Sequence, residues 1–147
     1  MAGIWTVTRN EVAPIHTCTA PEDGWLVTSH VIELPSQLLV VDAQYRLPYA
    51  REVVRYAATL KKPLNRLYVT HYHPDHQLGA AAFAAPVVAL ASVAGKIGAL
   101  GDRVAREERE IVGEDIPATA RRHDWCVEEE TELIDGVRIL QVGTLVC

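Results

Sequence analysis

The stretch VTHYHPDHQLGA, residues 69–80, decides the fold, because it joins an apolar segment to a cluster of polar side chains. The preceding run, Leu67–Val69, is typical of the last part of a buried strand. Pro74 fixes φ near the helical value and suits the first position of a helix. The stretch therefore predicts a strand, a short loop and the start of a helix.

Within this stretch, three of the six histidines of the chain and one aspartate occupy six consecutive positions. His71 and His73 should share one face, since successive side chains of an extended chain point to opposite faces. Asp75 and His76 should lie on the opening turn of the helix. The run lies in the middle of the chain and is interrupted by other residue types, which excludes an affinity tag. Imidazole and carboxylate ligands suit a metal such as zinc, so we predict a metal site at the end of the strand.

Length and composition limit the function classes. The chain has 147 residues and a formal net charge of −5, with a pI near 5.6, which predicts a single domain without the basic surface of a nucleic-acid binder. Hydrophobic residues make up 49% of the chain, yet no run approaches the ~18 to 20 apolar residues of a membrane helix. No signal peptide is visible, so a cytoplasmic location is expected. Three widely spaced cysteines predict reduced thiols rather than disulfides or a cysteine zinc site.

Hydrophobic periodicity predicts strands that alternate with helices, which indicates an α/β (α+β layered) architecture with helices on one face of a sheet. Three glycines at 95, 98 and 101 should weaken the last helix by about 1 kcal/mol each relative to alanine. Residues 113–127 are expected to form a loop. Two or three strands are predicted within residues 3–34, of which WLVTSHVIEL is the clearest. Further strands are predicted at 37–41, 66–70 and 86–90, and as a hairpin of 129–133 and 137–142. The predicted helices run from Pro48 to about residue 62, over 74–83, and from a capping Ser92 to Ile111.

The pattern H-x-H-x-D-H at residues 71–76 resembles the metallo-β-lactamase superfamily, and the segments WLVTSHVIEL and LLVVDA and Gly79 fit that family as well. The resemblance implies a four-layer αββα sandwich that binds up to two metal ions, usually zinc. His71 and His73 match two ligands of the first metal, and Asp75 and His76 match two ligands of the second. Asp75 would also act in catalysis by orienting the metal-bound water. The implied reaction is hydrolysis of a small-molecule ester, thioester, amide or phosphoester.

The chain departs from the family near its end. A third histidine of the family stands in a Gly-His-Thr stretch, whereas LQVGTLVC, residues 140–147, has Gly143 followed directly by Thr144. We therefore expect residues 1–147 to form a single, partial domain that corresponds to the N-terminal half of the sandwich. Each metal would keep two protein ligands, and one face of the sheet would be uncovered and available for self-association. Other donors are present, although none has the spacing of a family ligand: His16, His30, Asp42, His123 and Cys126.

Three hypotheses about function stay open. The first is a metal-dependent hydrolase whose missing ligands come from a longer chain or an assembly. The second is a catalytically silent remnant or interaction module that retains a partial metal site. The third is an iron enzyme of the same fold, since the same ligands accept iron. His73 stands where diiron oxygen reductases of this fold usually have glutamate, which argues against that narrower group.

Overall fold

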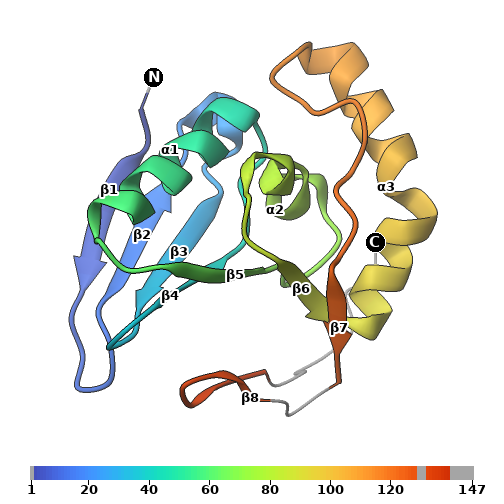
Figure 1. The fold of residues 1–147 in the computed structure, drawn as a ribbon. Helices are drawn as coiled ribbons and strands as arrows, with labels where there is room; N and C mark the ends of the chain where they lie inside the picture. The colour runs from blue at the N-terminus through green and yellow to red at the C-terminus, as the bar shows by residue number, and fades with distance from the viewer. Residues whose placement is uncertain (1, 129–131, 140–147) are drawn as a thin grey trace.

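A computed structural model describes residues 2–128 and 132–139. In these ranges the chain forms a mixed α/β fold around one seven-stranded sheet with the order β1-β2-β3-β4-β5-β6-β7 (Figure 1). The α/β architecture expected from the alternating sequence pattern is confirmed. None of the helices in this part of the chain combines the length and apolar composition that a bilayer crossing requires.

The first four strands form an antiparallel meander. The sequence predicted two or three strands within residues 3–34, and the structure has three there. The run at 37–41 forms a strand as predicted, and Leu38, Leu39 and Val40 within it are buried. The four strands are β1 (Ile4–Thr8), β2 (Ile15–Thr19), β3 (Thr28–Glu33) and β4 (Leu38–Val41).

From β4 to β7 the strands of the sheet are parallel, and the connections between them contain helices. Because parallel strands end at the same edge of a sheet, the segments that follow β4, β5 and β6 all begin at one edge. We call it the carboxyl edge. The elements of this part are α1 (Leu47–Thr59), β5 (Leu64–Tyr68), α2 (Pro74–Gln77), the 3-10 helix η2 (Leu78–Ala82), β6 (Val87–Leu90), α3 (Ala91–Val112) and β7 (Trp125–Val127).

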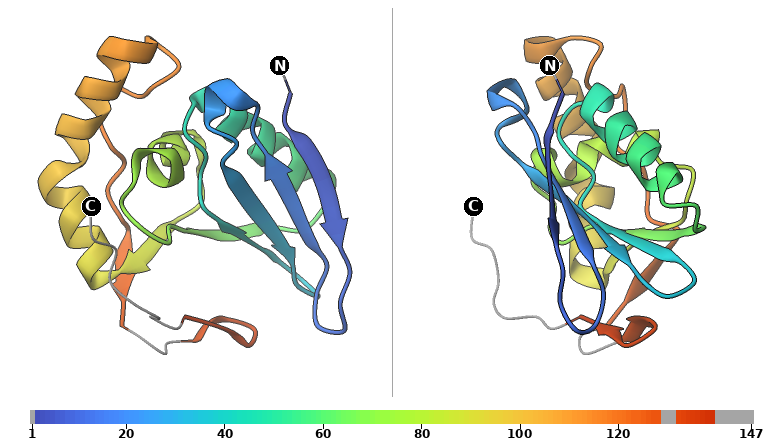
Figure 2. Two further views of the ribbon diagram at one scale, coloured as in Figure 1. Left: turned by 180° about the vertical axis from the view of Figure 1, so that it is seen from behind. Right: turned by 90° about the vertical axis from the view of Figure 1, so that its left-hand side faces the viewer.

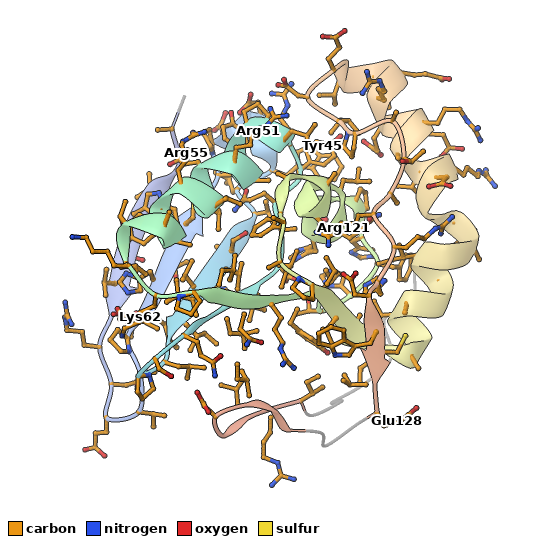
Figure 3. All side chains as sticks on the ribbon, in the orientation of Figure 1. Tyr45, Arg51, Arg55, Lys62, Arg121 and Glu128 are labelled. Carbon is orange, nitrogen blue, oxygen red and sulfur yellow. The ribbon has the colours of Figure 1, made fainter. Side chains whose placement is uncertain are left out.

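The helices cover one face of the sheet, as the sequence predicted. The apolar stripe of α1 includes Val53, which is 0% exposed and packs in one cluster with Val40 of β4 and Ile97 of α3. On the opposite side of α1, Arg51 and Arg55 extend away from the core (Figure 3). The helix is amphipathic because its apolar side chains recur at helical spacing.

Two expectations about local structure are wrong. Helix α3 starts at Ala91, directly after β6, so Ser92 lies inside its first turn and not at the cap position. The N-cap residue is Leu90, which forms no side-chain capping hydrogen bond. Part of the expected loop at 113–127 is the edge strand β7, which pairs with β6. A backbone hydrogen bond from Asp124 to the Val87 carbonyl, 2.8 Å long, begins this pairing. The strand is too short for an alternating pattern, so only the ladder with β6 defines it.

The second face of the sheet carries its own apolar cluster, which includes Leu39, Tyr68 and Val88. A C-terminal hairpin of β8 (Glu132–Ile134) and β9 (Val137–Arg138) adds Ile134 and Ile139 to this cluster. The face expected to be uncovered is therefore partly covered by the chain itself (Figure 2).

The hairpin has the turn that the sequence predicted. Asp135 and Gly136 have φ values of 43° and 82°, as the favoured two-residue hairpin turn requires. Residues 129–131 and 140–142 of the expected strands, and the Gly143-Thr144 pair, lie outside the described residues.

Candidate metal centre

The carboxyl edge of the sheet brings polar side chains together from two neighbouring strands. Asp42 follows β4 directly, and His71 lies just beyond β5. His76 comes from α2, which Pro74 opens as the sequence predicted. One possible ligand atom from each of Asp42, His71 and His76 lies within 4.8 Å of the others. We call these three residues the donor triad.

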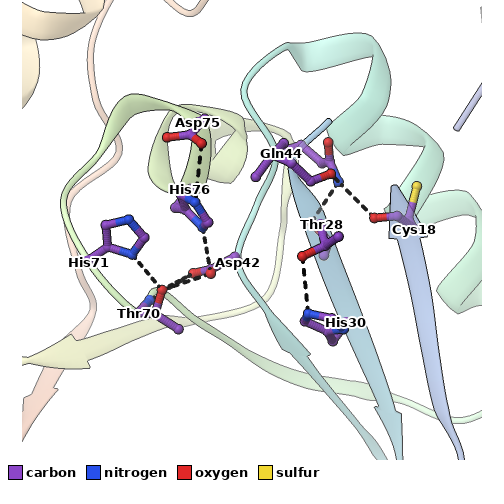
Figure 4. A network of polar contacts seen from close by, with 11 residues as sticks. Cys18, Thr28, His30, Asp42, Gln44, Thr70, His71, Asp75 and His76 are labelled. Atoms are coloured by element: carbon purple, nitrogen blue, oxygen red, sulfur yellow. Dashed lines mark hydrogen bonds and ion pairs between the residues drawn. The ribbon is translucent and has the colours of Figure 1, made fainter. Parts of the chain in front are cut away.

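Asp42 and Thr70 hold the ring of His71 (Figure 4). The Thr70 amide donates to Asp42 Oδ1 over 2.8 Å, and the Thr70 hydroxyl lies 2.8 Å from Oδ2. A carboxylate only accepts hydrogen bonds, so this hydroxyl donates to Asp42 and accepts from His71 Nδ1, 2.8 Å away. His71 is therefore the tautomer with hydrogen on Nδ1, which leaves the Nε2 lone pair available to a metal.

His76 lies between two carboxylates. Its Nδ1 is 2.7 Å from Asp42 Oδ2, and its Nε2 is 3.2 Å from Asp75 Oδ2. Burial lowers the pKa of His76, but hydrogen bonds to Asp42 and Asp75 outweigh this effect and raise the pKa to about 9. Burial likewise raises the pKa of Asp75, whereas its bond to His76 dominates and lowers it. Without a metal, the positive charge of His76 thus offsets part of the negative charge of its two carboxylate partners.

The structure gathers the four residues of the motif, although in a different grouping from the expected one. His71 and His76 belong to the donor triad, with ring centroids 4.1 Å apart. Asp75 contacts the triad through His76. The His73 ring lies 4.7 Å from the His71 ring, but within the described residues it contributes no atom to the triad. Burial, followed by the charge of His76, lowers the pKa of His71, which favours its neutral, metal-binding form.

An unusual backbone path places Asp42. Its φ is 62° and that of Gln44 is 78°, a left-handed conformation that is rare for residues other than glycine. The Gln44 side chain donates to Ser29 Oγ over 3.1 Å, and the Gln44 carbonyl accepts from the Gly79 amide over 2.9 Å. These contacts fix the segment from Asp42 to Gln44 against β3 and η2.

Asp42 is the residue that motif reasoning missed. It stands 28 positions before Thr70, so no local spacing connects the two. The available signal was an apolar strand that ends in an acidic residue next to another parallel strand.

The other candidate donors lie outside the triad. His16 bonds to Tyr56 and Glu33, and His30 bonds to two threonine hydroxyls. His123 is half-buried and its Nε2 forms no hydrogen bond in the described part of the chain. Cys126 is an exposed free thiol.

A comparison with protein families gives a match over most of the chain. The model of the metallo-beta-lactamase superfamily matches residues 23–144, which include every residue of the donor triad. The chain belongs to the metallo-beta-lactamase superfamily. A search of curated protein sequences finds no match to this superfamily member.

Solved structures of metallo-beta-lactamases share the fold. The DIM-1 enzyme exposed to ceftazidime has a TM-score of 0.59 and 14% identity, over 92% of this chain and 57% of its own. A metallo-beta-lactamase from Pontibacter korlensis has a TM-score of 0.58 and 21% identity, over 90% of this chain and 57% of its own. FIM-1 from Pseudomonas aeruginosa, in a mono-zinc form, has a TM-score of 0.54 and 19% identity, over 88% of this chain and 54% of its own. This superfamily member thus spans little more than half the length of these enzymes.

The residues at the carboxyl edge of this metallo-beta-lactamase relative fit a metal ion. Catalytic zinc takes three protein ligands of the imidazole and carboxylate types and keeps one position for water. The donor triad offers two imidazoles and one carboxylate at close range, and both imidazoles are held through Nδ1. Asp42 can therefore serve as a ligand or, through its bonds to Thr70 and His76, as the group that orients the histidines.

Proposed function

We propose that this chain carries the metal-binding half of a zinc-dependent hydrolase. One observation supports the proposal most directly: two histidines and an aspartate from three separate segments converge within 4.8 Å at the carboxyl edge of the sheet. The proposed ligands are His71 and His73 for one metal and Asp75 and His76 for a second, and Asp42 orients His71 through Thr70 and His76 directly. Iron is the alternative metal, since imidazole and carboxylate ligands accept it as well.

A divalent metal at such a site supplies Lewis acidity and lowers the pKa of a bound water toward neutrality. The residues of this chain would orient and move protons around it. Thr70 keeps hydrogen on His71 Nδ1, so that the Nε2 lone pair would be available to a metal. Asp75 has a lowered pKa and is ionised at neutral pH, so its carboxylate can accept a hydrogen bond from the attacking water. We propose Asp75 as the catalytic residue in this sense.

The proposed substrates are small molecules with an ester, thioester, amide or phosphoester bond. The Lewis acidity that a bound metal would supply suits all four bond types, because each has a carbonyl or phosphoryl oxygen. A cytoplasmic location is part of the same proposal.

The first test is metal content. The purified chain is incubated with one equivalent of zinc or of iron, freed of excess metal, and analysed for both elements. We expect zinc to be retained stoichiometrically and to be lost in the double variant His71→Ala, His76→Ala. His30→Gln is the matched control, because His30 bonds to threonines outside the donor triad. A wild-type chain that retains neither metal at micromolar concentration would contradict the proposal.

A catalytically silent interaction module is the second candidate. It is favoured by the presence of only two proposed protein ligands for each metal among residues 71–76. This candidate predicts that zinc is retained but that no ester, thioester, amide or phosphoester is hydrolysed faster than by free zinc. It also predicts self-association through the second face of the sheet, which sedimentation velocity would detect as a concentration-dependent increase in mass.

A further inference from the structure

A lysine of α3 lies beside the metal motif. Because α3 follows β6 directly, its first turns lie at the carboxyl edge, and the helix packs against α2. In its second turn, Lys96 places Nζ 4.5 Å from the centroid of the Tyr72 ring. Tyr72 stands between His71 and His73 in sequence, and its ring centroid lies 5.3 Å from that of His73. These two separations place the ammonium group one aromatic ring away from His73, a proposed metal ligand.

The surroundings of Lys96 leave room for a ligand. It is the single charged residue between Ala91 and Gly101, and it is exposed. A side-chain atom at the neighbouring Gly95 would meet nothing within 4 Å, so this part of the helix surface is open. Among the described residues, no carboxylate forms an ion pair with Lys96.

The contact with Tyr72 holds the ammonium group without neutralising it. A cation over an aromatic ring is attracted to the ring face but keeps its charge and its remaining hydrogen-bond donors. An uncompensated cation in a fixed position next to a reaction centre is suited to bind an anionic group of a substrate. It can also increase the rate at which that substrate associates with the protein.

We propose that Lys96 binds an anionic oxygen group, a carboxylate or a phosphate, on the substrate of this metal centre. The inference rests on the proposed function and narrows it: the hydrolysed molecule carries a negative charge near the bond that is cleaved. Lys96 is a specificity-determining residue in this proposal, and Tyr72 positions it.

The first experiment uses the zinc-loaded chain and two thiols of similar size, 3-mercaptopropionate and 3-mercapto-1-propanol. Both bind zinc through sulfur, and the first also carries a carboxylate. The ratio of their dissociation constants is measured by calorimetry in the wild type and in Lys96→Gln. We expect the variant to reduce the preference for the acid by about five-fold, as for one partly exposed charge pair, and to leave the affinity for the neutral thiol unchanged.

Arg103→Gln is the matched control, because it removes one positive charge from an exposed position further along the same helix. This variant should keep the wild-type ratio, and Lys96→Arg should keep most of it. An unchanged ratio in Lys96→Gln, with zinc still bound, overturns the role of Lys96 and leaves the proposed hydrolase intact. An equal reduction in Arg103→Gln overturns it as well, because the effect would then reflect net charge.

A second experiment does not need the metal. The metal-free chain is titrated separately with inorganic phosphate and with acetate, while NMR follows the Lys96 side chain and the Tyr72 ring. Saturable shifts that disappear in Lys96→Gln support an anion site, and the anion that saturates it at the lower concentration identifies the substrate group. Shifts that do not saturate with either anion overturn the site. If the chain retains no zinc, the proposed function fails, and this titration still decides the proposal about Lys96.

Discussion

Replacing Gly79 with alanine should damage the proposed metal centre, although Gly79 itself has no side chain to bind a metal. A Cβ atom at this position would lie 2.1 Å from the carbonyl oxygen of Ala43 and 2.7 Å from that of Gln44. Both neighbours are backbone atoms, so no side-chain rotation relieves the clash. The segment that must move is the one that places Asp42, and through it Thr70 and His76.

The expected cost follows from these contacts. Inserting a methyl group into a packed interior costs about 1–3 kcal/mol, and weakening the hydrogen bond between the Gly79 amide and the Gln44 carbonyl adds about 1 kcal/mol. We therefore expect Gly79→Ala to lower the free energy of unfolding by about 2–4 kcal/mol, out of the about 5–15 kcal/mol typical of a domain. Displacing the groups that orient the ligands should also weaken zinc binding by at least about ten-fold.

Urea unfolding of the metal-free chain and a zinc titration of the folded chain measure the two effects separately. Gly95→Ala is the control, because a Cβ there meets nothing within 4 Å. Removing a glycine from a helix interior should raise the free energy of unfolding by about 0.5–1 kcal/mol without changing zinc affinity. A Gly79→Ala variant with wild-type stability and wild-type zinc affinity would refute the argument that this close approach positions Asp42.

Three further predictions concern single polar contacts. Thr70→Val should weaken zinc binding about 10–100-fold, because the His71 tautomer is no longer fixed, whereas Thr70→Ser should retain most of the affinity. Equal losses of zinc affinity in the two variants, measured by zinc titration, would show that the hydroxyl is unimportant. In the metal-free chain the raised pKa of His76, about 9, gives a stabilisation that is complete below pH 6.5 and lost as the pH rises through 9. Its size is on the order of 2–3 kcal/mol, and urea unfolding near pH 6 and near pH 10 should show this loss in the wild type but not in His76→Gln. Bonds from Lys62, and then from His16, lower the pKa of Glu33, so its contribution is present above the ordinary carboxyl pKa and lost as the pH falls. Glu33→Gln should cost about 0.5–1 kcal/mol near pH 7 and flatten the acid side of the stability profile; an unchanged profile would argue against this ion pair.

Much of the fold could be predicted because its signals are local. Helix α1 follows from the spacing of Tyr49, Val53 and Ala57, and the hairpin turn follows from Asp135-Gly136. Strand β7 could not be predicted, since three residues carry no periodicity and only the edge of β6 makes them a strand. The start of α3 was also missed, because this helix begins at the end of a strand without a side-chain cap.

The sequence by itself determined the donor types of the candidate centre: three histidines and an aspartate within six positions, after a strand and around a proline, identify the motif regardless of the rest of the chain. Only the tertiary structure decided how these side chains are used. Parallel pairing of β4 with β5 brings Asp42 to Thr70, and the fixed carboxylate then selects the tautomer of His71 and the charge of His76. The reason is physical: ligand identity is encoded over a few covalent bonds, whereas orientation and protonation depend on neighbours that only folding brings within hydrogen-bond distance.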